Sequence, residues 1–129
     1  AEQLMLGGLE AYPENTGFYA DLAGFYSGQG RYAEAVPHYE ALIQTESENG
    51  WWYAYLADVY RNLGDPESAL PLLGEAADRS SGDPWLNDFI GWIYVGLGDC
   101  EDALGHFEYA LELDSSIESS AEGLQSCGG

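Results

Sequence analysis

The sequence predicts an all-α solenoid of antiparallel helix pairs, and two observations carry this prediction. The first is an internal repeat, because a shift of 34 residues places 17–43 on 51–77 and then on 85–111 with matching chemistry. The second is the spacing within each unit, where apolar residues recur three and four positions apart on both sides of a glycine. That spacing is typical of one helix face, so each unit is expected to contain two helices.

The repeated columns identify the expected core of each pair. Large apolar residues share columns in both predicted helices of a unit, and small residues beside them allow antiparallel helices to approach closely. The aromatic side chains then fill the space between the helices. The residues expected to be among the most buried are Tyr26, Leu56, Tyr60, Ile90, Tyr94, Ala103 and Phe107.

The same alignment marks the turn inside each unit. Gly30, Gly64 and Gly98 share one column, where glycine allows the positive φ angle that ends the first helix. Asp65 and Asp99 follow directly, and an aspartate at this place can accept from the free amides of the next helix's first turn. We therefore expect the second helix of these units to begin just after each aspartate.

The segment IGWIYVGLGDCEDALGHFEYALELD (90–114) resembles the tetratricopeptide repeat, a 34-residue unit with an early Leu-Gly, a following Tyr, and then Ala and Phe. The resemblance implies a right-handed superhelix whose concave groove, lined by the first helix of each repeat, binds peptides. Residues 1–15 fall in phase with second helices and residues 118–129 with first helices, which gives eight helices in total. The expected organisation is a lone second helix (1–15), three repeats (16–49, 50–83 and 84–117) and a lone first helix (118–129).

Some side chains on the predicted first helices point away from the buried columns and toward the groove that the resemblance implies. One interpretation is that the tryptophans among them cover neighbouring helices as part of the core. The other is a site for an apolar segment carrying Lys or Arg, because indole faces attract cations and Trp is favoured as an interface anchor. The candidates are Trp51, Asp58, Arg61, Trp85, Asp88 and Trp92.

The charge balance restricts the partners. The chain has 23 Asp and Glu against 3 Arg, and its formal net charge is -20, while 46% hydrophobic residues indicate a folded domain. Nucleic acids and anionic membrane surfaces require a basic surface, so both are argued against. The acidity then reflects either a solvated surface or a protein or peptide partner that is basic or apolar. No apolar run approaches the roughly 18 to 20 residues of a transmembrane helix.

Catalytic and metal-binding patterns are not found in the sequence. His38 and His106 occupy equivalent places two repeats apart, and neither has a Cys or His at ligand spacing. No calcium-loop, phosphate-loop or nucleophile-elbow pattern occurs. We therefore expect a protein that is not an enzyme and uses no cofactor and no metal.

Two cysteines, Cys100 and Cys127, leave two alternatives open. They form one disulfide, as exported proteins often do, or they remain two separate thiols. Spacing along antiparallel helices places them a turn or two out of register. A chain that begins Ala-Glu-Gln fits either a mature form after signal cleavage or an excised fragment. Export to an extracellular or periplasmic location is favoured over the cytoplasm.

An alternative to a binding scaffold is a structural protein that assembles head to tail. Residues 118–129 of one copy and 1–15 of the next supply one first helix and one second helix, which together would complete a composite repeat and extend a homopolymeric filament. The net charge opposes this contact, because neighbouring copies repel. The residues expected at the junction are Leu4, Met5 and Leu9 on one copy and Leu124 and Cys127 on the other.

Overall fold

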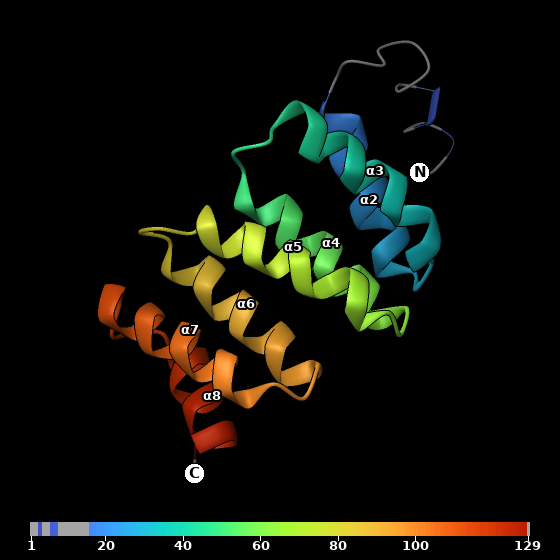
Figure 1. The fold of residues 1–129 in the computed structure, drawn as a ribbon. Coiled ribbons are helices and arrows are strands. Elements are labelled where there is room, and N and C mark those ends of the chain that lie inside the picture. Colours follow the sequence, from blue (N-terminus) through green and yellow to red (C-terminus); the bar gives the residue numbers. More distant parts are fainter. Residues whose placement is uncertain (1–2, 4–5, 8–15, 129) are drawn as a thin grey trace.

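The computed structural model describes residues 3, 6–7 and 16–128, and this part of the chain contains seven α-helices and no strand (Figure 1). The expected all-α helical-repeat fold is therefore confirmed. The expected helix over 1–15 lies for the most part outside the described residues. The helices are α2 (Thr16–Gly28), α3 (Tyr32–Thr45), α4 (Gly50–Asn62), α5 (Pro66–Asp78), α6 (Pro84–Gly96), α7 (Cys100–Leu113) and α8 (Glu118–Gly128).

Consecutive helices pack in pairs that follow one another along the array. Helix α2 packs on α3, α4 on α5, and α6 on α7, so the ranges 16–49, 50–83 and 84–117 each contain one pair. Among the first helices, α4 lies beside α6 and α6 beside α8, and α8 also packs on α7. Helices α2 and α8 lie at opposite ends of the array (Figure 1). None of the described helices is both long and apolar enough to cross a membrane.

Side chains before four helices satisfy the free amides of the first turn. Asp65 and Asp99, the two residues predicted for this role, accept from backbone amides at 3.2 and 3.1 Å. Asn49 and Asp83 do the same at the starts of α4 and α6, at 3.0 and 3.1 Å. Because each cap fixes where a helix begins, these four residues also fix the register of the helix pairs.

The turn glycines have the backbone conformation that their column predicts. Gly30, Gly64 and Gly98 have φ angles of 75°, 76° and 80°, in the left-handed region that other residues rarely adopt. Gly82, between α5 and α6, has a φ of 80° and was not singled out from the sequence. These four glycines reverse the chain without strain and keep the turns short.

The core contains most of the residues that the columns predict. Leu56, Ile90, Tyr94, Ala103, Phe107 and Tyr26 are buried. The prediction for Tyr60 was wrong, because this side chain is only partly buried between the two core clusters. His38 and His106 stack on Tyr26 and Tyr94 at 5.6 Å, whereas the equivalent position beside Tyr60 is Leu72, so no imidazole covers its ring.

The ring of Phe107 is inserted between α6 and α8. Two glycines make room for it, because a Cβ on Gly91 would lie 2.6 Å from the ring and a Cβ on Gly123 would overlap it. Trp92 meets the ring edge-on, with the ring centroids 5.2 Å apart. The side chains of Ile117 and Ser120 are buried in the same region, so α8 completes the core of the last helix pair.

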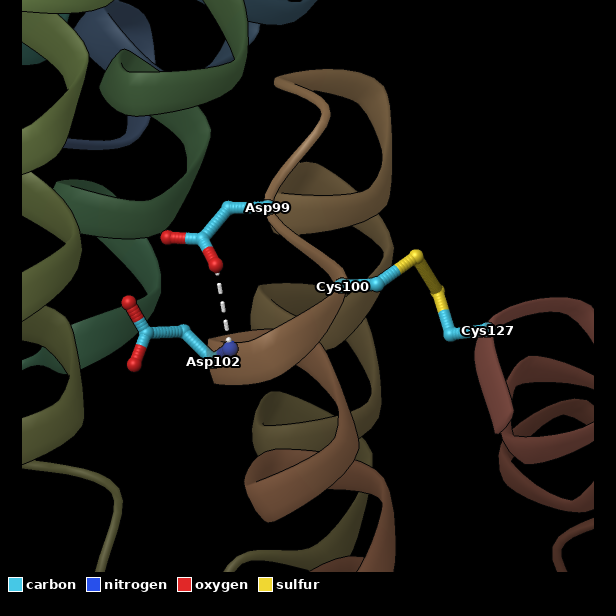
Figure 2. The surroundings of a disulfide bond; sticks show 4 residues. All are labelled: Asp99, Cys100, Asp102 and Cys127. Carbon is cyan, nitrogen blue, oxygen red and sulfur yellow. Dashed lines mark hydrogen bonds between the residues drawn. A yellow bond between two sulfur atoms is a disulfide. The ribbon is translucent and has the colours of Figure 1, made fainter.

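A disulfide joins Cys100, at the start of α7, to Cys127 in α8 (Figure 2). The two Cα atoms are 5.3 Å apart, so the expectation that these residues lie a turn or two out of register was wrong. Helices α7 and α8 pack against each other, with the Phe107 ring of α7 seated on Gly123 of α8, and the start of α7 meets the end of α8. The bridge encloses a sequence separation of 27 residues and holds α8 against the last helix pair.

Candidate functional site

Aromatic rings from α3, α4 and α6 form a continuous row, which we call the aromatic row. Tyr55 lies at its centre, with ring centroids 6.0 Å from Tyr39, 6.0 Å from Trp52, 5.7 Å from Trp51 and 5.3 Å from Phe89. Trp51 and Tyr55 are four residues apart on α4 and therefore share one helix side. With 36% of its surface exposed, Tyr55 presents the row to solvent.

Trp51 is held from two directions. Its indole Nε1 donates to a carboxylate oxygen of Asp83 at 3.0 Å, and its ring stacks on Phe89 at 5.8 Å and 24°. The same Asp83 caps α6 with its other oxygen. Trp51 is consequently a partly buried link between α4 and α6 whose ring still belongs to the surface row.

Closer to the end of α4 than Trp51 and Tyr55, the predicted groove residues Asp58 and Arg61 form an ion pair with each other. The Nε and Nη2 atoms of Arg61 both donate to one oxygen of Asp58, at 3.0 and 2.7 Å. The arginine side chain lies across α6, where a Cβ on Gly96 would come within 2.7 Å of it. Arg61 therefore connects α4 and α6, and its charge is compensated within the chain.

Asp88 was expected in the groove, and the structure contradicts this expectation. Only 7% of its surface is exposed, and its carboxylate accepts from the Ser120 hydroxyl of α8 at 2.7 Å. Trp92 is partly buried on the same side, where its indole Nε1 donates to Ser119 at 2.7 Å. Because α8 covers this part of α6, Asp88 and Trp92 hold α8 in place, and the core interpretation applies to Trp92.

Trp85, at the start of α6, differs from the other predicted tryptophans. Its side chain is 55% exposed, the largest value among the large apolar residues in the described part of the chain. The predicted set therefore divides, because Trp51 and Trp85 contribute to the surface and Asp88 and Trp92 lie beneath α8. We call the surface of α4, α6 and α8 around Trp51, Tyr55, Trp85 and Phe89 the first-helix face.

Sequence reasoning missed Tyr55 and Phe89. Both stand one position beyond the helix side that was counted as facing the groove, and they are equivalent residues 34 positions apart. Their pairing across α4 and α6, at 5.3 Å, depends on how neighbouring first helices cross. The recurrence of an aromatic residue in this column was the signal that could have found them.

The two histidines each pack within their own helix pair. Burial lowers the pKa of His38 and of His106. His106 Nδ1 lies 3.0 Å from the side-chain oxygen of Asn87, whose amide group also donates to the Ser80 carbonyl at 3.1 Å. Over the described residues, no group of three or more His, Cys, Asp or Glu side chains is placed to hold a metal ion.

The residues expected at a head-to-tail junction are only partly described. Leu4, Met5 and Leu9 lie outside the described residues. Leu124 is partly buried and packs against the core of its own chain. Cys127 was expected at the junction, but its sulfur is bonded to Cys100 of the same chain and is therefore not available for a bond to another copy (Figure 2).

Stacked helix pairs that each contact their neighbours place the chain in the class of helical-repeat proteins. The family model described as tetratricopeptide repeat matches residues 27–93, which is more than half of the chain. The chain therefore belongs to the tetratricopeptide-repeat family, as the resemblance of residues 90–114 implied. A search of curated proteins found no match.

Solved structures of low sequence identity share the fold. The first TPR domain of the human RPAP3 protein is 20% identical, with a TM-score of 0.77 over 90% of this chain and 91% of that one. The first TPR of Spaghetti, bound to HSP90 peptide SRMEEVD, is 19% identical, with a TM-score of 0.76 over 89% and 91%. A thermophilic TPR protein of Thermus thermophilus is 23% identical, with a TM-score of 0.78 over 98% and 73%.

Proposed function

We propose that this protein is a non-enzymatic interaction scaffold that binds a peptide or protein segment on its first-helix face. The observation that carries the proposal is the aromatic row, whose central ring, Tyr55, is 36% exposed, together with the still more exposed Trp85 on α6. Exposed aromatic clusters of this kind are typical of interaction surfaces, because rigid rings supply contact area at low entropic cost. Membership of a repeat family with a peptide-bound structural neighbour supports the same function.

The charge of the chain indicates the sign of the partner. The peptide SRMEEVD on the Spaghetti domain has three acidic residues among its seven. A chain with a net charge of -20 repels such a peptide, and Asp21, Glu118 and Glu122 are exposed on first helices α2 and α8. We therefore propose a segment that combines apolar residues with Lys or Arg, drawn to the surface by charge and retained by the rings.

The disulfide supports a location for this function. Disulfides persist in oxidising compartments and are rare where thiols are kept reduced. Because Cys100 and Cys127 are bonded, we propose that the protein works in an extracellular or periplasmic setting. The scaffold interpretation is preferred to the filament, since Cys127 and Leu124 already have contacts within their own chain.

Peptide binding measured by fluorescence anisotropy tests the proposal. The probes are two labelled peptides with blocked ends, one alternating leucine with arginine and the other alternating leucine with glutamate. The arginine peptide is expected to bind and to weaken as the salt concentration rises, because exposed charges are screened. Tyr55→Ala is expected to weaken binding, whereas Leu113→Ala, an exposed residue of second helix α7, is not. Equal binding of the two peptides, or binding unaffected by Tyr55→Ala, would contradict the proposal.

A further inference from the structure

We propose that Trp85 is the anchor for an arginine side chain of the bound segment, an inference that rests on the proposed function. Two equivalent residues of successive repeats differ in exposure. Trp51 and Trp85 stand 34 positions apart, in the same place of successive repeats. Trp51 is partly buried, whereas Trp85 is 55% exposed. Equivalent positions in a regular array predict equal exposure, so something that covers Trp51 is missing at Trp85.

The repeat alignment identifies the groups that cover Trp51 and are missing at Trp85. Trp51 is held by the Asp83 carboxylate, which accepts from its indole N–H, and by the ring of Phe89. Thirty-four positions further on, the corresponding residues are Ile117 and Gly123. An isoleucine has no acceptor for an indole N–H, and a glycine has no ring to stack. Within the described residues, Trp85 accordingly has no hydrogen bond and no ring contact through its side chain.

Both replacements follow from the way α8 docks. Ile117, which directly precedes α8, is buried as part of the core. Gly123 is required because any larger residue there would overlap the ring of Phe107. The structure that closes the last helix pair therefore also removes the two groups that would cover Trp85. Its indole face and its N–H are left for a ligand.

An arginine side chain fits this position best. A planar guanidinium stacks on an indole face and is attracted by its quadrupole. The chain uses the same contact internally, since Arg31 and Arg79 lie 4.6 and 4.4 Å from the ring centroids of Tyr26 and Tyr53. Helix α8, which packs beside α6, exposes Glu118 and Glu122 to balance the charge. A backbone carbonyl of the same segment supplies the acceptor that Ile117 lacks.

The arginine has to come from a partner, because the three arginines of the chain are already engaged. Each forms an ion pair with an acid of its own helix or helix start, at 2.6 to 2.7 Å. The partner that fits is therefore a segment with at least one arginine, and lysine is expected to bind less well because its compact ammonium is more strongly hydrated.

The test compares peptides and variants in one anisotropy assay on the full chain. The peptides alternate leucine with arginine, with lysine, or with citrulline, which keeps the shape of arginine without its charge. The variants are Trp85→Ala, Trp85→Leu and, as a matched control, Leu70→Ala, a residue that is exposed on second helix α5. Circular dichroism and urea unfolding verify that each variant folds as the parent does.

The expected result is about a fivefold to tenfold weaker binding of the arginine peptide to both Trp85 variants, with no change for Leu70→Ala. The parent is expected to prefer arginine over citrulline by a similar factor. If Trp85→Ala binds as the parent does, the anchor assignment fails and the proposed function stands. If Trp85→Leu retains binding, the contact is apolar and the arginine assignment fails. If the parent binds none of the three peptides, both proposals fail.

Discussion

Phe107 and Gly123 belong to different helices, yet the ring of one occupies the space that a side chain on the other would need. The contact seats α8 on the last helix pair and brings Ser119 and Ser120 within hydrogen-bonding distance of Trp92 and Asp88. It also explains why a glycine, Gly123, stands in the column where the two preceding repeats have Tyr55 and Phe89. The absence of a side chain at Gly123 thus allows α8 to pack against the last helix pair of its own chain.

Substituting this glycine is expected to loosen α8. The change Gly123→Ala forces the Phe107 ring to move and is expected to lower the free energy of unfolding by about 1 to 3 kcal/mol. The matched control is Gly105→Ala in the interior of α7, where an added Cβ meets nothing within 4 Å. That change is expected to raise the free energy of unfolding by about 0.5 to 1 kcal/mol, because alanine loses less backbone entropy in a helix. Urea unfolding measures both, and equal effects would show that the ring contact is unimportant.

Removing the disulfide is expected to destabilise the chain. For a closed loop of 27 residues, chain entropy gives a loss of about 3 to 4 kcal/mol in the variant Cys100→Ala/Cys127→Ala. The measurement is urea unfolding with and without a thiol reductant. The reductant is expected to destabilise the parent and to leave the variant unchanged. A parent that unfolds at the same urea concentration in both conditions would argue against a stabilising bridge.

The buried Asp88 is expected to depend on the Ser120 hydroxyl. The change Ser120→Ala removes the donor at 2.7 Å and leaves a carboxylate oxygen without that partner in a region that is only 7% exposed. A loss of about 1 to 3 kcal/mol in the free energy of unfolding is expected. Ser115→Ala, at an exposed serine before α8, serves as the control and is expected to change little. A loss of stability no larger than that of the Ser115→Ala control would show that the carboxylate finds another donor.

Stability is expected to depend on pH through His106. Burial lowers its pKa in the folded chain below the ordinary value of 6.5, so the unfolded chain binds a proton at a higher pH than the folded one. The free energy of unfolding therefore includes a contribution from His106 that is fully present above about 6.5 and is lost as the pH falls toward the folded pKa.

The variant His106→Asn separates this contribution from that of the carboxylates. Urea unfolding at pH 7.5 and 5.5 is expected to show a larger relative loss of stability for the parent than for the variant. Asparagine does not titrate, and it keeps an N–H donor at the position of the imidazole Nδ1, which lies 3.0 Å from the Asn87 side-chain oxygen. His38, whose pKa burial also lowers, is present in both proteins and cancels. An identical pH dependence in parent and variant would contradict the prediction.

Local chemistry made the fold predictable from the sequence. The repeat columns placed the helix pairs, Gly30, Gly64 and Gly98 marked the turns, and Asp65 and Asp99 marked helix starts. Each of these depends on backbone conformation or hydrogen bonding within a few residues. Such features depend on residues that are close together in the sequence, so one sequence was sufficient to predict them.

The candidate site was less predictable, because its geometry comes from contacts between repeats. Asp88 was expected in the groove and lies beneath α8, and Tyr55 and Phe89 were overlooked although they meet at 5.3 Å. The distance between Cys100 and Cys127 was also misjudged. In each case the outcome depends on how two helices cross, and the position of a residue along its own helix does not determine that crossing.

The fluorescence of the four tryptophans reports on the state of the protein surface. Three indole N–H groups are bonded within the chain, from Trp51 to Asp83, from Trp52 to Glu46 and from Trp92 to Ser119. The fourth tryptophan faces water. A collisional quencher such as acrylamide therefore reaches that indole first and removes the long-wavelength part of the emission. A molecule that covers it protects this component and shifts the spectrum to shorter wavelength, so occupancy can be followed by intrinsic fluorescence alone.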